Sequence, residues 1–116
     1  MNEQRVFQMS FSDLYPLYLH KVERKGRTQQ ELDIVLGWLT GYDKEGLDAQ
    51  VAAGTTLADF FAHAPRIHPN TSRIKGTVCG VRVEDIADPL MQRIRWMDKL
   101  VDELARGRAL EKILRT

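Results

Sequence analysis

The residues best suited to chemistry gather in one stretch of the sequence, between Asp59 and Glu84. No acidic residue lies between these two positions, whereas six basic or imidazole side chains do: His63, Arg66, His68, Arg73, Lys75 and Arg82. Lysine and arginine bind phosphate and carboxylate groups, and arginine can hold such a group through two parallel hydrogen bonds. The stretch is therefore a candidate anion-binding site.

The same stretch contains residues that interrupt regular structure, among them Pro65, Pro69, Gly76 and Gly80. Irregular segments on a helical scaffold commonly carry function. The predicted binding residues are His63, Arg66, His68, Asn70, Arg73, Lys75, Arg82 and Asp85. The alternative is that the bases form ion pairs with acidic helix faces elsewhere in the chain, which would carry no function.

Arg82 stands out among these bases because it lies inside the run Val81-Arg82-Val83, with acidic residues directly after it. Two roles fit this position. Asp85 or Asp88 would hold it as a structural arginine, or it would point into a pocket together with Arg73 and Lys75. The sequence leaves both roles open.

The sequence contains no phosphate-binding loop ending in Lys-Ser/Thr, no His-Glu-x-x-His and no nucleophile elbow. We therefore favour a binding or interaction module whose partner is a small anion or another protein. The alternative is an enzyme acting on a phosphorylated or carboxylated small molecule at the same segment. The candidates for its proton-transfer group would be His63, His68 and Asp85.

Metal ligands at zinc-like spacing are absent from the sequence. His63 and His68 are five positions apart with Pro65 between them, and no Cys-x-x-Cys occurs. We expect neither a metal nor a cofactor. Cys79, between Val78 and Gly80, is expected to be a small buried hydrophobe. The alternative is a thiol made reactive by neighbouring bases.

A second basic cluster consists of Lys21, Arg24, Lys25 and Arg27, interrupted by Glu23. A helix C-terminus accounts for such a cluster, because the helix dipole favours cations there. Contacts with nucleic-acid phosphates would also suit it. Seventeen basic residues against sixteen acidic ones give a net charge of +1, which argues against strong nonspecific binding. Weak nucleic-acid binding is accordingly our third functional hypothesis.

The length of 116 residues predicts a single domain spanning residues 1–116. The single cysteine cannot form an internal disulfide, which favours a reducing, cytoplasmic location. No apolar run approaches the roughly 20 residues of a membrane span, so no membrane association is expected.

Hydrophobic spacing and capping residues predict a mainly α-helical fold of about five helices. The predicted N-caps are Ser12, Thr28, Asp43, Thr56 and Asp88. The predicted stops are Gly26, Gly41, Gly54, Pro65 and Gly107. The strongest apolar stripe lies in the last helix, residues 89–106, and comprises Leu90, Ile94, Met97, Val101 and Leu104. Beside it, Trp96 and Leu100 would form an exposed edge through which a homodimer could assemble.

Residues 77–83 alternate between apolar and small or polar side chains, as a strand does, and so do residues 6–11. The two segments together would form a short two-stranded β-ribbon. A short helix from Ser72, stopped by Gly80, is the competing interpretation of residues 72–83.

Several motifs resemble a bacterial family catalogued as domain of unknown function 2200. In the first half these are Met9-Ser10-Phe11, Tyr15-Pro16-Leu17-Tyr18, Glu23-Arg24-Lys25-Gly26-Arg27-Thr28 and Trp38-Leu39-Thr40-Gly41-Tyr42. In the second half they include Ile74-Lys75-Gly76, Cys79-Gly80-Val81-Arg82-Val83-Glu84-Asp85-Ile86, Asp88-Pro89-Leu90-Met91 and Asp98-Lys99-Leu100-Val101-Asp102-Glu103-Leu104. The resemblance covers nearly the whole chain. It implies a small, mostly α-helical domain standing alone, and it implies no activity and no functional residues.

Overall fold

A computed structural model describes residues 3–115. Within this range the chain forms seven α-helices, two 3-10 helices (η) and two short strands. In order they are α1 (Glu3–Phe7), α2 (Phe11–Glu23), α3 (Gln29–Thr40), α4 (Lys44–Ala53), α5 (Leu57–Ala62), η1 (Pro69–Arg73), β1 (Thr77–Val78), β2 (Val81–Arg82), η2 (Val83–Asp85), α6 (Pro89–Ala105) and α7 (Leu110–Ile113). The predicted mainly α-helical class is confirmed. The count exceeds five because short helices lie at both ends, α1 and α7.

Side-chain caps fix where the five longer α-helices begin. At each start a side-chain oxygen accepts a backbone N–H of the first turn, and these oxygens belong to Ser10, Thr28, Asp43, Thr56 and Asp88. Thr28 and Glu31 form the predicted capping box. The predicted cap at Ser12 is wrong, because Ser10 accepts the N–H of Asp13 at 3.1 Å and Ser12 lies inside α2.

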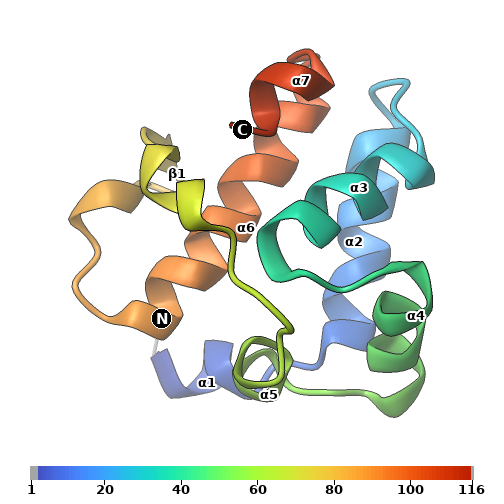
Figure 1. Ribbon diagram of the computed structural model, residues 1–116, viewed down its shortest axis with the longest axis vertical. Helices are drawn as coiled ribbons and strands as arrows, with labels where there is room; N and C mark the ends of the chain where they lie inside the picture. The colour runs from blue at the N-terminus through green and yellow to red at the C-terminus, as the bar shows by residue number, and fades with distance from the viewer. Residues whose placement is uncertain (1–2, 116) are drawn as a thin grey trace.

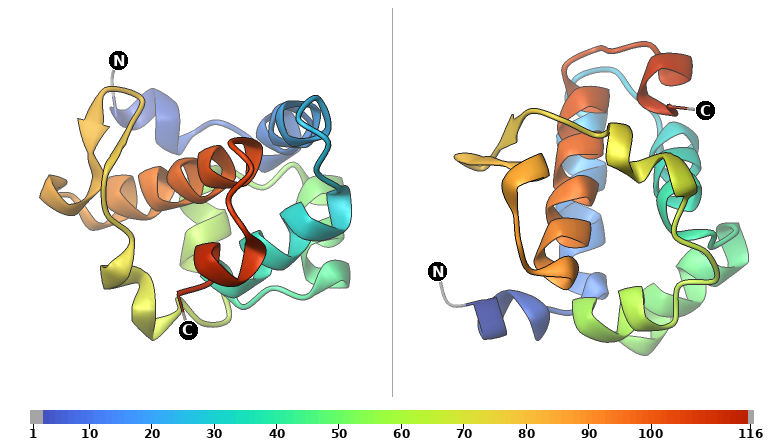
Figure 2. Two further views of the ribbon diagram at one scale, coloured as in Figure 1. Left: turned by 90° about the horizontal axis from the view of Figure 1, so that it is seen from above. Right: turned by 60° about the vertical axis from the view of Figure 1, so that its left-hand side comes forward.

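Helix α6 forms the centre of the fold. It contacts α2, α3 and α5, and also the β1 strand, η2 and α7. Figures 1 and 2 show it with α2 and α3 on one side and the β1–β2 hairpin on the other. Because other elements pack on both sides of α6, Leu100 is fully buried. The expected exposed edge formed by Trp96 and Leu100 is therefore wrong, and the homodimer through residues 89–106 stays a prediction without that edge.

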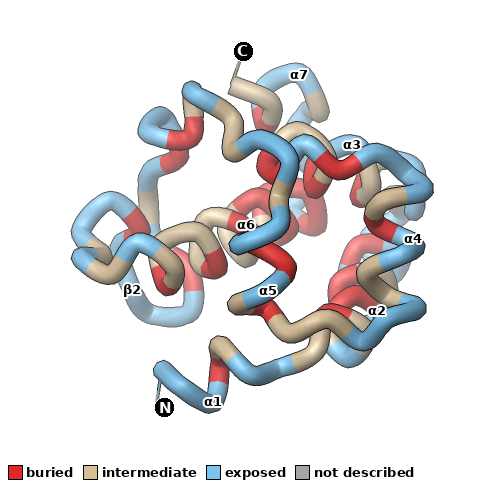
Figure 3. Tube along the Cα trace, turned by 60° about the horizontal axis from the view of Figure 1, so that its bottom comes forward, coloured by how far each residue is buried: buried red, intermediate tan, exposed pale blue. Residues whose placement is uncertain are grey.

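A cluster of stacked rings joins α2, α5 and the turn before α4. The Phe11 and Phe60 rings stack with their centroids 4.2 Å apart, and the Tyr42 ring lies 4.9 Å from that of Phe60. The Tyr42 hydroxyl donates a hydrogen bond to the Phe60 carbonyl at 2.7 Å. Stacked aromatic pairs add to the stability gained from burial alone. Figure 3 shows the buried positions of these helices turned toward one another and the exposed positions turned outward.

The predicted ribbon between residues 6–11 and 77–83 does not form. Residues 3–7 are helical, and the extended backbone around Ser10 pairs with Thr56 in an isolated bridge. The N–H of Phe11 bonds to the Thr55 carbonyl, and the N–H of Leu57 bonds to the Met9 carbonyl. Of the predicted strand over residues 6–11, the extended backbone around Ser10 is present, and its partner is the segment before α5.

Residues 77–83 pair with themselves. Thr77 lies opposite Arg82 and Val78 opposite Val81 in an antiparallel hairpin. The two turn residues, Cys79 and Gly80, have φ values of 51° and 78°. Positive φ at both positions is the mark of the type I′ turn that suits the twist of a hairpin. The strand interpretation is thus correct for residues 77–78 and 81–82, but a turn separates them and Val83 begins η2. The helix interpretation of residues 72–83 is wrong, because η1 ends at Arg73 and residues 77–78 are extended.

The chain folds as one globule with a radius of gyration of 13.1 Å, close to the value of about 13 Å expected for a domain of this length. Among the described residues, no helix is both long and apolar enough to cross a membrane.

Candidate functional site

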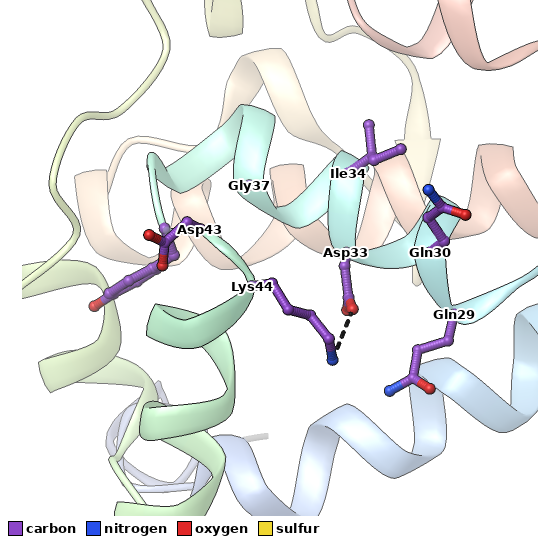
Figure 4. Close-up of a pocket in the computed structure, with 8 residues that line it drawn as sticks. Gln29, Gln30, Asp33, Ile34, Gly37, Asp43 and Lys44 are labelled. Carbon is purple, nitrogen blue, oxygen red and sulfur yellow. Dashed lines mark ion pairs between the residues drawn. The ribbon is translucent and has the colours of Figure 1, made fainter.

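A cavity of about 600 Å³ lies between α3 and the start of α4, and we call it the α3–α4 pocket. Its lining residues are Gln29, Gln30, Asp33, Ile34, Gly37, Tyr42, Asp43 and Lys44. Figure 4 shows the Asp33 and Lys44 side chains meeting in the space between the two helices, with Gln29 nearby at the start of α3. Binding sites for small molecules are typically concave, of this volume, and lined by apolar groups with a few polar ones.

Helical spacing explains why α3 supplies one wall of the pocket. Gln30, Asp33, Ile34 and Gly37 recur at intervals of three and four and so share one face of the helix. The opposite face carries the buried stripe that includes Leu32, Leu36 and Leu39. The wall therefore stays outside the core, and the Ile34 side chain is 40% exposed.

Two glycines allow the chain to turn back from α3 toward α4. A Cβ atom at Gly37 would lie 2.8 Å from the carbonyl oxygen of Tyr42, closer than such contacts occur. Gly41 ends α3 with φ of 80°, a conformation that costs little only for glycine. The close turn brings Tyr42, Asp43 and Lys44 beside α3.

Asp33 is the least exposed charged group of the pocket. Its side chain is 10% exposed, and the Tyr15 hydroxyl donates a hydrogen bond to its Oδ1. Gln29 donates a hydrogen bond from Nε2 to the Tyr15 oxygen at 3.1 Å, which holds the phenol in place. Lys44 Nζ lies 3.3 Å from Asp33 Oδ2. A carboxylate this poorly solvated needs such partners because its desolvation is costly.

Two pKa shifts favour the protonated forms of Tyr15 and Lys44. Burial, followed by the hydrogen bond to Asp33, raises the pKa of the Tyr15 hydroxyl far above its usual range. Asp48 and then Asp33 raise the pKa of the Lys44 ammonium. Tyr15 therefore stays a hydrogen-bond donor, and Lys44 stays a cation.

The predicted binding residues lie elsewhere, mostly in the stretch from His63 to Arg82, which we call the basic segment. It runs from the end of α5 to the hairpin (Figures 1 and 2). Within residues 3–115, none of its four bases Arg66, Arg73, Lys75 and Arg82 forms an ion pair, and all four are exposed. The alternative in which acidic helix faces pair with these bases is therefore wrong, as is the role of Arg82 as a buried structural arginine.

The structure brings only part of the basic segment together. The Glu84 carboxylate accepts the N–H of Gly76 at 3.0 Å. This bond is the main cause that lowers the pKa of Glu84, and the positive charges of Arg82 and Lys75 add to it. Both bases thus act on the Glu84 carboxylate beside the hairpin. Asp85 is exposed in η2.

His68 and Asn70 hold the segment in place. The His68 ring stacks on Trp38 with centroids 4.3 Å apart, and its Nδ1 accepts the N–H of Asn70 at 3.0 Å. Asn70 donates a hydrogen bond from Nδ2 to the Arg115 carbonyl at 2.8 Å.

His63 is exposed at the C-terminal end of α5. Within residues 3–115, the three proposed proton-transfer groups, His63, His68 and Asp85, form no hydrogen bond or ion pair with one another.

Cys79 is exposed, so its predicted burial is wrong. Its Sγ lies 4.0 Å from Asp98 Oδ2. Among the residues described, no group of three or more His, Cys, Asp or Glu side chains is arranged to hold a metal ion.

The second basic cluster is partly paired. Lys21 lies 3.4 Å from Asp102, and Arg27 pairs with Glu31 at 2.8 Å. Arg27 also donates hydrogen bonds to the carbonyls of Leu104 and Arg108. It therefore links the α2–α3 turn to the end of α6.

Sequence reasoning missed the α3–α4 pocket. Asp33 and Lys44 stand eleven positions apart, on different helices, with no motif joining them. The available signal was Ile34, a large apolar residue off the stripe of α3 and next to an acid. A single exposed apolar residue is common on protein surfaces, so this signal alone does not identify a pocket.

Comparison with known proteins agrees with this fold. Residues 5–115 match the family described as "Uncharacterized protein conserved in bacteria (DUF2200)". The crystal structure of uncharacterized protein SP1917 is similar, with 43% sequence identity and a TM-score of 0.91 over 98% of this chain and 93% of that chain. None of the curated proteins matches the chain. With the family match extending over nearly its whole length, the chain belongs to the bacterial family of uncharacterized proteins called domain of unknown function 2200.

Proposed function

We propose that the protein is a binding module for a small molecule, and that the α3–α4 pocket is its site. The observation that carries this proposal is the Asp33 carboxylate, only 10% exposed, in the wall of a cavity of about 600 Å³. A charged group held in a largely apolar hollow is typical of a site that orients a ligand.

The chemistry of the pocket favours binding over catalysis. Tyr15 and Asp33 are hydrogen-bonded to each other, and Lys44 lies between the carboxylates of Asp33 and Asp48. A general acid or base must reach the proton that it transfers. Here Asp33 and Lys44 are already engaged by other side chains, Asp43 accepts the N–H of Gly46, and Tyr42 donates to the Phe60 carbonyl.

A fragment screen followed by backbone amide NMR tests this proposal. We expect fragments to shift amide signals within residues 29–44 of the wild-type protein. Ile34→Trp places a large ring in the pocket and should abolish these shifts. Leu17→Trp is the matched control, because Leu17 is 62% exposed on α2 and lies outside the pocket lining. If no fragment shifts these amides, or if Ile34→Trp leaves the shifts intact, the α3–α4 pocket is not a binding site.

Anion binding at the basic segment is the second candidate. It is favoured by the four exposed bases that have no ion pair within residues 3–115. Bases left without acidic partners are available to a phosphate or carboxylate ligand.

Thermal-shift measurements with inorganic phosphate, citrate and short oligonucleotides test this second candidate. A small anion at a hundred times its dissociation constant would stabilise the protein by roughly 2.7 kcal/mol. Arg82→Ala should remove that stabilisation. An oligonucleotide shift that falls steeply with salt would instead support nucleic-acid binding. Equal stabilisation of the wild type and Arg82→Ala would exclude Arg82 from an anion site.

A further inference from the structure

The chemistry of the α3–α4 pocket points to the kind of molecule that fits it, an inference that rests on the proposed binding function. The buried member of the Asp33–Lys44 ion pair is the acid. The Asp33 side chain is 10% exposed, whereas that of Lys44 is 58% exposed. The carboxylate is therefore a fixed part of the wall, and the ammonium reaches it from the solvent side.

The two oxygens of Asp33 have different partners. Oδ1 accepts the hydroxyl of Tyr15, which Gln29 holds in turn. Within residues 3–115, the ion-pair partner of Oδ2 is the Lys44 ammonium, at 3.3 Å. A phenol fixes the position of the carboxylate without neutralising it, so the negative charge still requires a cation.

Lys44 can leave Asp33 without becoming unpaired. Its ammonium also lies 3.1 Å from Oδ1 of Asp48, a residue of the same helix that does not line the pocket. Exposed ion pairs of this kind contribute little to stability. An incoming cation therefore displaces Lys44 from Asp33 at small cost.

The remaining lining residues favour a ligand that has an apolar part next to its cationic group. Ile34 and Tyr42 present apolar surface, and Gly37 adds no side chain. Asp43 is a second carboxylate, and the carboxamides of Gln29 and Gln30 can accept or donate hydrogen bonds. With Lys44 displaced, the formal charges left are both negative, which excludes an anionic ligand by repulsion.

We infer that the α3–α4 pocket binds a small aliphatic amine, whose primary ammonium takes the place of Lys44 on Oδ2 of Asp33. The alkyl chain then lies along Ile34 and Tyr42. In the absence of an amine, the Lys44 ammonium occupies the position of the ligand's ammonium beside Asp33.

Titration with 1,4-diaminobutane, followed by amide NMR at pH 7 and constant ionic strength, tests this inference. The diamine should shift amides within residues 29–44, and the uncharged 1,4-butanediol should not. Asp33→Asn keeps an acceptor for Tyr15 but removes the charge, so affinity should fall at least about tenfold. Lys44→Met removes the competing cation, and affinity should rise roughly two- to fivefold, the range that an exposed ion pair is worth.

Asp13→Asn is the matched control, because Asp13 is an exposed acid in the first turn of α2. Its affinity for the diamine should equal that of the wild type. Equal binding by the wild type and Asp33→Asn, equal shifts from the diol, or no binding to Lys44→Met would each overturn the amine inference. The proposed binding function would still be supported if uncharged fragments bound in the pocket of the wild type and not in that of Ile34→Trp. It would be overturned only if no fragment bound there either.

Discussion

His68 couples the stability of this fold to pH near neutrality. Burial, followed by the positive charge of Arg66, lowers the pKa of its imidazole below the usual value. The neutral ring is the form that the structure uses, because Nδ1 accepts the N–H of Asn70 and a protonated Nδ1 cannot accept. The ring also lies face to face with Trp38.

The stability of the protein should therefore fall as the pH falls. The native state binds this proton less readily than the unfolded chain does. The stabilisation is thus present above the unfolded pKa of about 6.5 and is lost as the pH falls through the lower native value. The free energy of unfolding should decrease by less than about 1.4 kcal/mol per pH unit, the limit for one proton. Urea unfolding between pH 8 and pH 5 measures this slope.

His68→Asn is the informative variant, because an asparagine oxygen can accept the same N–H at a helix start but does not titrate in this range. Its slope should be shallower than that of the wild type. His63→Asn changes an exposed histidine and should leave the slope unchanged. A wild-type slope in His68→Asn would place the titrating group elsewhere.

At the scale of elements, local signals in the sequence were sufficient for most helices. Thr28, Asp43, Thr56 and Asp88 cap helices as predicted, because a cap depends on residues three positions away. The hairpin could not be assigned completely, since its first turn residue is Cys79 rather than the asparagine or aspartate typical of a type I′ turn. Residues 6–11 were therefore predicted as the partner of this segment, whereas β1 pairs with β2.

The candidate site depended on contacts between elements and was less accessible to sequence reasoning. Charge distribution correctly located a run of bases without acids, and the structure leaves those bases unpaired within residues 3–115. The α3–α4 pocket required knowing that Gly37 and Gly41 let α4 fold back beside α3. No local pattern around Asp33 reveals Tyr15 and Lys44 as its partners.

The junction between α6 and the segment after α7 provides the next prediction. Glu103 is 7% exposed at its side chain and accepts two hydrogen bonds from Arg115, at 2.7 and 3.0 Å. Arg108 lies 3.2 Å from the same carboxylate. Removing one member of a buried, hydrogen-bonded ion pair leaves the other charge poorly solvated.

We expect Glu103→Gln to lower the free energy of unfolding by about 2 kcal/mol. Glu111→Gln is the matched control, because Glu111 is exposed and has no ion pair within residues 3–115, and its effect should stay within about 0.5 kcal/mol. Chemical denaturation of both variants measures the difference. Comparable losses in the two would show that the Glu103 contacts do not stabilise the native state.

At the scale of the whole molecule, contacts distant in sequence hold the fold together. Tyr18 of α2 donates a hydrogen bond to Asp98 of α6, eighty positions away. Burial and the Asp98 carboxylate raise the pKa of the Tyr18 hydroxyl well above its usual range, so this bond keeps its donor at physiological pH. This bond ties α2 to α6, against which α2 and α3 both pack.

The central position of α6 has a consequence for how the chain acquires its structure during synthesis. Helices α2 and α3 are made first, but the helix against which they both pack comes more than forty residues after α3 ends. Until α6 leaves the ribosome, the apolar stripes of the earlier helices have no central partner. Contacts so far apart in sequence slow folding, because a long loop must close before they form. The nascent chain should therefore expose Leu32, Leu36 and Leu39 to chaperones until α6 has left the ribosome and can pack against α2 and α3.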